Sequence, residues 1–252
     1  MKNEEDIISD CLTGLKFANE IIVLDQGSTD KSVAIAKKFT NKVYETSIED
    51  FATNRTKLKE LATNDWILYV DADERIGPGL ISEINKVIKE DKFSYFYIPR
   101  KNFVLGKRIK HGGWWPDFAP RLFKKNDLIK WEGKIHESPL VKGQSANFKN
   151  ALEHFTARTV TLMLNKSIKW AKIEAELYHK HNNPKVTILK VIKASSTEFI
   201  YRYIIKKAFL DGTIGLIESI FQALHKAMIF IYLWEIQNQV YEKFSKEARQ
   251  TQ

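Results

Sequence analysis

Residues 65–76 read DWILYVDADERI, an apolar run that ends in closely spaced acids. The nearly continuous apolar character of residues 66–70 is typical of a strand buried on both faces. Residues 20–25 read EIIVLD and repeat the pattern, again ending in a carboxylate. Segments with helical spacing, such as 51–61 and 80–88, separate these runs. The alternation predicts an α/β domain with helices flanking a mostly parallel sheet.

The rhythm changes after residue 93. Aromatic, strand-like segments punctuated by glycines suggest short antiparallel strands and working loops as far as residue 158. From residue 159 the pattern is mostly helical. We therefore expect an α/β domain over residues 1–158 and a helical region over residues 159–252.

Composition limits the function classes. The chain has 252 residues and a net charge of +9, so a negatively charged partner is expected. Charge alone does not choose among nucleic acid, anionic lipid and phosphorylated substrates. The single cysteine, Cys11, excludes a disulfide framework and a cysteine-based zinc site. We expect no signal peptide, because residues 1–6 are polar and acidic, and no conventional membrane span, because no uninterrupted apolar stretch of ~20 residues is present.

Two acids lie where the second apolar run ends. In extended backbone, Asp71 and Asp73 would point to the same face while Ala72 points away. Ligands of open α/β sheets bind beyond the carboxyl ends of the strands, so Asp25 should face the same crevice. Paired carboxylates suit Mg²⁺ or Mn²⁺ held jointly with substrate phosphates. Alternatively, the acids simply punctuate turns.

The chain resembles the inverting glycosyltransferases of family two, which have the nucleotide-sugar-binding GT-A fold. The resemblance rests on Asn3-Glu4-Glu5, on EIIVLDQGSTDKS (20–32) and on residues 65–76. A bacterial subgroup that includes lipopolysaccharide core glucosyltransferases is also similar. That similarity rests on HGGWWPDFAPRLFKK (111–125), WEGKIHE (131–137) and YRYIIKKAFLDGTIG (201–215).

The resemblance implies a UDP-sugar donor and a lipid-linked saccharide as acceptor. Asp25 would contact the base or ribose, and Asp71 would lie near the ribose and diphosphate. Asp73, together with Asp71, would hold Mg²⁺ or Mn²⁺, which stabilises charge on the departing nucleoside diphosphate. The transferred sugar would be a hexose, with glucose as the first choice.

An inverting transfer needs a base that takes the proton of the acceptor hydroxyl. The resemblance makes Glu137 the first choice, since its segment occupies the position of the family's base-bearing acid. Asp117 is the second choice. A loop acid such as Glu137 can equally cap a helix or pair with Arg121.

Four further residues are candidates for substrate binding. Arg121 and His136 could contact the diphosphate or an acceptor phosphate, although Arg121 could equally form a structural ion pair. Trp114 and Trp115 could form an apolar platform under a sugar ring. Loop tryptophans also often pack into the core of their own domain.

One departure from the family concerns the start of the sequence. Members of the family carry an apolar strand directly before the Asn-Glu-Glu element, whereas only Met1 and Lys2 precede Asn3 here. The favoured expectation is that the given start is internal or that the sequence is a fragment. If the protein has instead lost the strand, the second hypothesis is a non-catalytic, membrane-docking remnant of a glycosyltransferase.

The C-terminal region is apolar and basic. Residues 214–234 are apolar over long stretches, and Arg202, Lys206 and Lys207 precede them. Such a segment can lie in a membrane interface with its cations near anionic headgroups, which predicts a peripheral protein on the cytoplasmic face of the membrane. Alternatively, these helices pack on the catalytic domain or on another subunit.

Other function classes lack their motifs. The sequence contains no G-x-G-x-x-G dinucleotide turn, no G-x-x-x-x-G-K-[ST] phosphate loop and no H-E-x-x-H metal motif. No recognisable nucleic-acid module accompanies the positive charge, so we expect no nucleic-acid partner.

Overall fold

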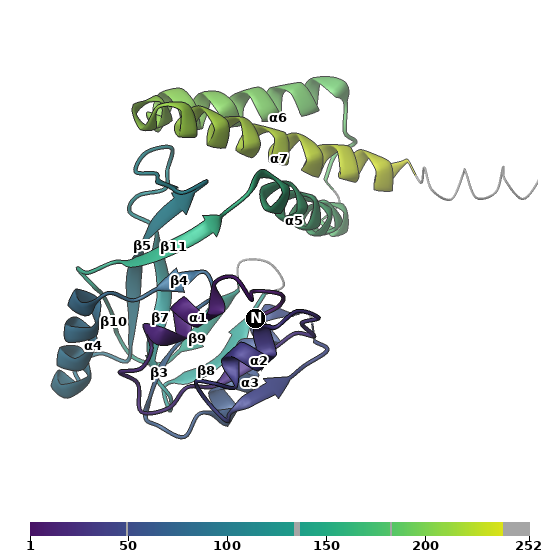
Figure 1. Cartoon of the computed structure of the whole chain (residues 1–252). Coiled ribbons are helices and arrows are strands. Elements are labelled where there is room, and N and C mark those ends of the chain that lie inside the picture. The colour runs from purple at the N-terminus through teal and green to yellow at the C-terminus, as the bar shows by residue number, and fades with distance from the viewer. Residues whose placement is uncertain (49, 134–136, 182, 239–252) are drawn as a thin grey trace, which may run out of the picture. The chain divides into compact units, whose positions relative to one another are not determined.

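A computed structural model describes residues 1–48, 50–133, 137–181 and 183–238 (Figure 1). The chain divides into two compact units. The first unit comprises Met1–Asn102 and Pro116–Thr156, and the second comprises Phe103–Trp115 and the chain from Ala157 onward. Residues 103–115, expected within the first domain, thus belong with the C-terminal helices.

A two-stranded parallel sheet opens the first unit. Strand β1 (Val23–Asp25) pairs with β2 (Val43–Glu45), and the short helices α1 (Ile8–Thr13) and α2 (Ser32–Ala36) pack beside it. On the other side of β1, the amino group of Met1 donates to the Leu24 carbonyl at 2.7 Å. In the described part of the chain, no hydrogen-bonded strand joins β1 to the larger sheet.

The larger sheet has seven strands, in the order β3-β7-β5-β11-β4, with β6 and β10 both paired to β5. Among the pairings whose direction is described, β10–β5 is parallel and β11–β4, β3–β7, β5–β6 and β5–β7 are antiparallel, so this sheet is mixed rather than mostly parallel. The α/β class is confirmed. Strand direction was misjudged because burial on both faces does not reveal which way the neighbouring strand runs. The strands are β3 (Trp66–Leu68), β4 (Glu74–Arg75), β5 (Tyr95–Val104), β6 (Lys107–Arg108), β7 (Phe118–Lys124), β10 (Ser145–Asn147) and β11 (Leu152–Ala157).

Two apolar clusters cover opposite faces of this sheet. Leu122 and Phe123 are neighbours on β7 and therefore point to opposite sides. Leu122 packs with the helix α4 (Pro78–Glu90), while Phe123 packs with α3 (Phe51–Leu61). A two-stranded ribbon, β8 (Leu128–Glu132) and β9 (Ser138–Val141), joins the Phe123 cluster through Leu128 and Trp131.

Local side-chain chemistry accounts for where α3 and α4 begin. Asp50 caps α3 by accepting a hydrogen bond from the Thr53 amide at 2.7 Å. Pro78 opens α4, where its fixed φ suits the first helical position and no amide hydrogen is needed.

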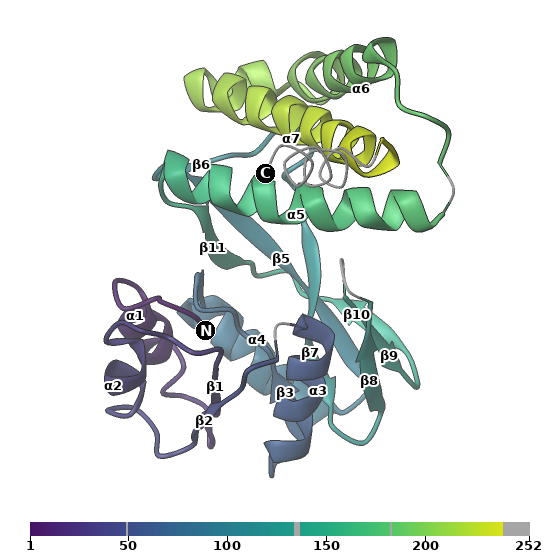
Figure 2. The same ribbon diagram turned by 90° about the vertical axis from the view of Figure 1, so that its right-hand side faces the viewer.

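The second unit is built from three long helices, which Figure 2 shows together. They are α5 (Val160–Lys180), α6 (Ile188–Ile200) and α7 (Thr213–Gln237), and α7 packs against both of the others. A π-helical turn (Tyr201–Ile205) and a 3-10 turn (Ala208–Asp211) connect α6 to α7.

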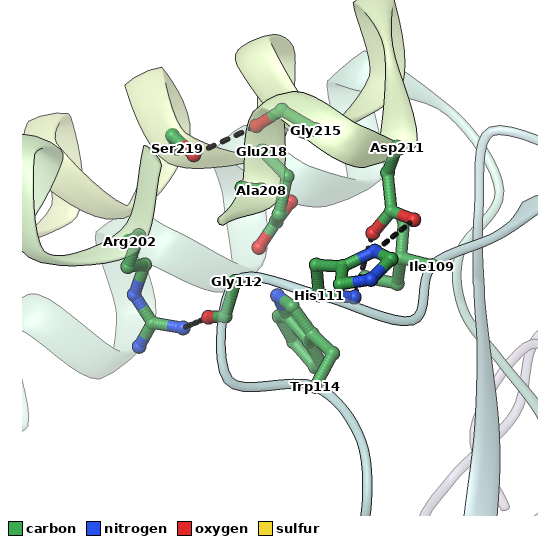
Figure 3. A pocket seen from close by; sticks show the side chains of 10 residues that line it. All are labelled: Ile109, His111, Gly112, Trp114, Arg202, Ala208, Asp211, Gly215, Glu218 and Ser219. Atoms are coloured by element: carbon green, nitrogen blue, oxygen red, sulfur yellow. Dashed lines mark hydrogen bonds and ion pairs between the residues drawn. The ribbon is translucent and has the colours of Figure 1, made fainter. Parts of the chain in front are cut away.

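Close packing joins the 103–115 segment to these helices (Figure 3). The His111 ring lies 2.8 Å from an Asp211 carboxylate oxygen, and Arg202 donates to the Gly112 carbonyl at 3.0 Å. A Cβ at Gly215 would lie 1.9 Å from the Ala208 carbonyl oxygen, so only glycine fits at this point of α7.

One helix of the described residues, α7, is long and apolar enough to cross a membrane by length and composition. A core helix passes the same test, and 39% of the apolar window of α7 is buried within the fold. Length and composition therefore do not decide whether α7 meets lipid.

Candidate active site

A tight turn carries the paired acids at the end of the β3 segment. The Glu74 amide donates to the Asp71 carbonyl at 2.9 Å, and the Asp71 amide donates to the Glu74 carboxylate at 3.1 Å. The backbone from Asp71 to Glu74 is thus a turn and not an extended strand. The expectation that Asp71 and Asp73 share a face through strand alternation is wrong, because that rule holds only in extended backbone.

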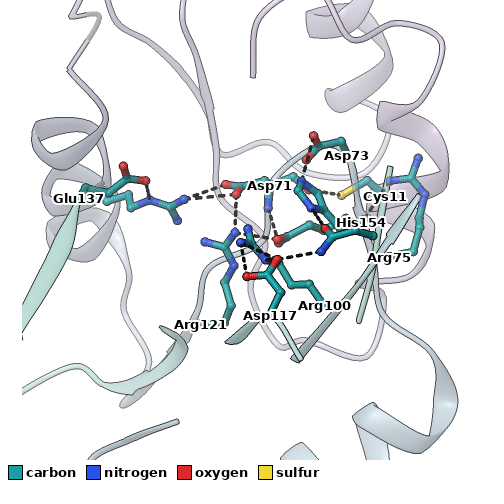
Figure 4. Close-up of polar contacts among 12 residues, drawn as sticks. Cys11, Asp71, Asp73, Arg75, Arg100, Asp117, Arg121, Glu137 and His154 are labelled. Carbon is teal, nitrogen blue, oxygen red and sulfur yellow. Dashed lines mark hydrogen bonds and ion pairs between the residues drawn. The ribbon is translucent and has the colours of Figure 1, made fainter. Parts of the chain in front are cut away.

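The two carboxylates accordingly meet different partners (Figure 4). Asp71 accepts hydrogen bonds from Arg55 at 3.0 Å and from Arg121 at 2.5 Å. Burial acts to raise the pKa of Asp71, but the charges of Arg121 and Arg55 outweigh it and hold this pKa well below its ordinary value. Asp71 is therefore an anion that balances two cations.

Arg121 and Glu74 form the buried part of this network. Arg121 lies on β7 and donates to Glu74 at 2.6 Å, and neither side chain is more than 5% exposed. Burial raises the pKa of Glu74, and the Arg121 charge opposes that rise. Of the two roles left open for Arg121, the structural ion pair is the one seen. Contact with substrate phosphate stays a proposal.

Sequence reasoning overlooked Arg55. Its guanidinium lies over the rings of Tyr69 and Trp131, 5.5 and 5.0 Å from their centroids. Its Nε donates to Glu137 at 3.3 Å while its Nη2 donates to Asp71. Arg55 thus links the two acids, but an arginine within an amphipathic helix gives no signal that separates it from solvent-facing ones.

The first candidate base, Glu137, pairs with Arg55 and not with Arg121. Its side chain is 20% exposed. His136 lies outside the described residues, and its proposed substrate contact stays a prediction.

The second candidate base, Asp117, is more fully engaged. Arg100 binds both of its carboxylate oxygens at 3.0 Å, and the Asn102 amide donates to it at 2.8 Å. Three hydrogen bonds occupy the carboxylate oxygens of Asp117, whereas one described hydrogen bond occupies those of Glu137. The geometry therefore favours Glu137 over Asp117 as the base.

Asp73 lies beside His154, a residue that sequence reasoning also missed. Strand β11 pairs with β4 and brings the His154 Nε2 to 3.4 Å from an Asp73 oxygen. Nδ1 of the same ring lies 2.6 Å from the Asn102 side-chain oxygen. That oxygen only accepts, so Nδ1 carries a proton and Nε2 is the ring nitrogen that faces Asp73.

An oxygen and a nitrogen donor facing each other in this way fit a divalent cation. The hydrogen bond from Nδ1 to an acceptor is also the usual support of a ligating histidine. Within the described ranges, no group of three or more His, Cys, Asp or Glu side chains gathers for a metal. The protein would therefore supply few ligands and leave the others to phosphate and water, as is common for Mg²⁺.

Asp25 shapes the loop after β1. Its carboxylate accepts from the Gly27 and Ser28 amides at 3.1 and 2.9 Å and from the Ser28 hydroxyl at 2.6 Å. The residue is 1% exposed. Its proposed contact with the nucleotide stays a prediction, and the described contacts fix the loop conformation.

The two tryptophans belong to the second unit. Trp114 packs beside a core cluster that contains Ile109 and Ile214. Trp115 is 40% exposed, and the Arg108 guanidinium lies 5.2 Å from its ring centroid. Of the pair, Trp115 is the more exposed, and its role as a platform stays a prediction.

Comparison with curated proteins gives relatives of two kinds. The chain is 35% identical over 155 residues to the SPbeta prophage-derived glycosyltransferase SunS of Bacillus subtilis. The matched region covers 58% of this chain and 35% of that protein. The chain thus spans about a third of the length of the first relatives that it matches. It is also 21% identical to the lipopolysaccharide core biosynthesis glycosyltransferase LpsC of Rhizobium meliloti, over 98% of this chain and 92% of that protein.

Among solved structures, Staphylococcus aureus TarS 1–349 in complex with UDP is similar at 13% identity and a TM-score of 0.48, covering 96% of this chain and 90% of that one. Residues 1–139, more than half of the sequence, match the family model described as glycosyl transferase family 2. That span includes every described acid and arginine of the Asp71 network. The chain belongs to glycosyl transferase family 2.

Proposed function

We propose that the chain transfers a hexose, with glucose as the first choice, from a UDP-sugar to a lipid-linked saccharide such as lipopolysaccharide core. The observation that carries the proposal is the family match over residues 1–139. The name of LpsC, a relative that the chain covers almost completely, supports the choice of acceptor.

In the proposed reaction, the acceptor hydroxyl oxygen attacks the anomeric carbon and the bond from that carbon to the phosphate oxygen breaks. The electron pair of that bond leaves with the nucleoside diphosphate, and the hydroxyl proton passes to Glu137. A single displacement of this kind inverts the anomeric centre. Glu137 is favoured because its carboxylate has one described donor, Arg55, whereas Asp117 has three hydrogen bonds.

Asp73 and His154 would hold Mg²⁺ or Mn²⁺, and Asp71 would stay nearby with its two arginines. When bound, the cation stabilises negative charge on the leaving diphosphate. Asn102 fixes the His154 ring so that Nε2 faces Asp73. Arg55 supplies a fixed positive charge between Asp71 and Glu137.

The remaining contacts are proposed by analogy with the family. Asp25 and its loop would meet the base or ribose, and Arg121 and His136 would act near phosphate. Trp115, more than Trp114, would offer its exposed ring to a sugar. A lipid-linked acceptor would place the protein on the cytoplasmic face of the membrane.

The test is a transfer assay with UDP-glucose, Mn²⁺ and a core-lipid acceptor, in which the release of UDP is measured. Asp73→Ala should lower turnover about a thousandfold, since it removes a ligand of the cation. Asp65→Ala is the matched control, because this exposed acid precedes the same strand, β3. Wild-type turnover in Asp73→Ala would remove the metal role.

A non-catalytic remnant is the second candidate. It is favoured by the separation of β1 from the larger sheet in the described residues, because nucleotide sites of this fold lie along strand ends. Calorimetric titration with UDP and Mn²⁺ separates the two candidates. A chain that binds no UDP, and releases none from UDP-glucose, would support the remnant.

A further inference from the structure

The most exposed apolar side chains of the described residues gather on one stretch of the second unit. Six large apolar side chains between residues 188 and 210 are 54–76% exposed, more than any others described. Helix α6 has no buried residue at all. The six residues are Ile188, Leu189, Ile192, Ile204, Ile205 and Leu210.

These side chains follow one another along residues 188–210. Ile188 and Ile192 are four positions apart and so lie on one face of α6, and exposed Ile200 ends that helix. The π-helical turn continues the strip with exposed Ile204 and Ile205, and the 3-10 turn adds Phe209 and Leu210. We call residues 188–210 the α6 strip.

The charge around the α6 strip is strongly positive. Between residues 185 and 207 the chain carries six Lys or Arg residues and one acid, Glu198. That acid is neutralised within the strip, since Arg202 donates to it at 2.6 Å. Lys193, Lys206 and Lys207 are exposed. An apolar surface edged by exposed lysines matches the interface of an anionic bilayer, which takes up apolar side chains and attracts cations.

Helix α7 is the competing element, because it is long enough to cross a membrane. It packs against both α5 and α6, however, and it buries the polar side chains Glu218 and Ser219. Helix α6 has 13 residues, too few to span a bilayer, so it would lie in the plane of the interface.

We infer that the α6 strip is the surface on which this protein docks to an anionic membrane, with α6 lying in the interface and α7 serving as its packing support. The inference rests on the proposed function only for the expectation that the acceptor is in a membrane. The contacts that carry it lie wholly in the second unit.

The experiment is flotation of the full chain with phosphatidylcholine vesicles, with and without phosphatidylglycerol. The triple variant Ile188→Gln, Leu189→Gln, Ile192→Gln should lose at least about tenfold in vesicle partitioning, since three apolar side chains no longer enter lipid. The variant Lys193→Gln, Lys206→Gln, Lys207→Gln should lose about tenfold or more in vesicle partitioning. This loss is expected only with the vesicles that contain phosphatidylglycerol. The control is the triple variant Leu216→Gln, Ile220→Gln, Leu224→Gln, which alters exposed residues of α7.

Three outcomes would overturn the inference. They are wild-type partitioning of the α6 variant, a larger loss in the α7 control, and a lipid-free dimer that the α6 variant converts to a monomer in light scattering. UDP binding by the α6 variant should equal that of wild type. Vesicle binding by Asp73→Ala should also be unchanged, so failure of the proposed transfer and failure of docking are read separately.

Discussion

The two units of the molecule treat charged and apolar side chains in opposite ways. In the first unit, Arg55, Glu74 and Arg121 are all buried and meet around Asp71. In the second, the buried charged side chains among those described are Glu218 and Asp211, while the α6 strip exposes its apolar residues. The fold of the first unit holds charged side chains in its interior, whereas the second unit leaves an apolar surface exposed to solvent. Internal chemistry and external docking can therefore be tested separately.

The strongest way to sharpen this contrast is to remove the proposed base. Glu137→Gln should lower transfer about a thousandfold with UDP binding unchanged, because the amide keeps the shape but cannot take the acceptor proton. Steady-state transfer and UDP titration together measure the two effects. Glu132→Gln, at an exposed position on β8, is the control. If Asp117→Asn is impaired in transfer while Glu137→Gln is not, Asp117 becomes the base.

The next test breaks the buried pair itself. Arg121→Met should lower the free energy of unfolding by about 3 kcal/mol or more, since it leaves Glu74 buried without its cation. Urea unfolding measures the change. Adding Glu74→Gln should restore part of the loss, because the uncompensated charge is removed.

Lys86→Met is the matched control for the buried pair. Lys86 pairs with Glu90 at 3.7 Å on the surface of α4, where its side chain is 74% exposed. Its loss should change the unfolding free energy by less than about 0.5 kcal/mol. An equal loss from both variants would show that burial of the first-unit charges does not matter.

The smallest expected effect concerns Glu218 in the second unit. Burial raises its pKa, although Gln222 donates to it at 2.7 Å and the charges of Arg202 and Lys166 oppose the rise. A carboxyl whose folded-state pKa is raised holds its proton more tightly when folded. Stability is therefore lost as the pH rises from the unfolded pKa toward the folded one.

Glu218→Gln should flatten this decline and raise the thermal midpoint at pH 7 relative to wild type by a few degrees, for a gain of about 1 kcal/mol. Thermal unfolding at pH 5 and pH 7.5 measures the difference. Glu235→Gln, exposed on the same helix, should leave the pH dependence unchanged. The same decline in Glu218→Gln as in wild type would assign the pH dependence to another group.

The sequence predicted the positions of strands and helices better than the turns and tertiary contacts around them. The apolar runs at residues 20–25 and 65–71 do mark β1 and β3, and the helix expected over 80–88 lies within α4. An apolar run does not tell where extended backbone gives way to a turn. This is why the Asp71–Asp73 geometry was misjudged.

The missed site residues share a physical reason. Arg55 and His154 reach the acids through tertiary contacts, 16 positions from Asp71 for Arg55 and through the β11–β4 pairing for His154. No local periodicity records such contacts. The α6 strip was likewise hidden, because its helical spacing is also that of a helix packed on a core.

The turn that presents Asp73 also bears on whether this motif can be transplanted. Its backbone is closed by Glu74, and Glu74 is balanced by an arginine 47 positions further along the chain. Grafting residues 71–74 alone onto another scaffold would import an uncompensated acid and lose the turn. A graft would therefore have to carry residues 71–74 together with Arg121.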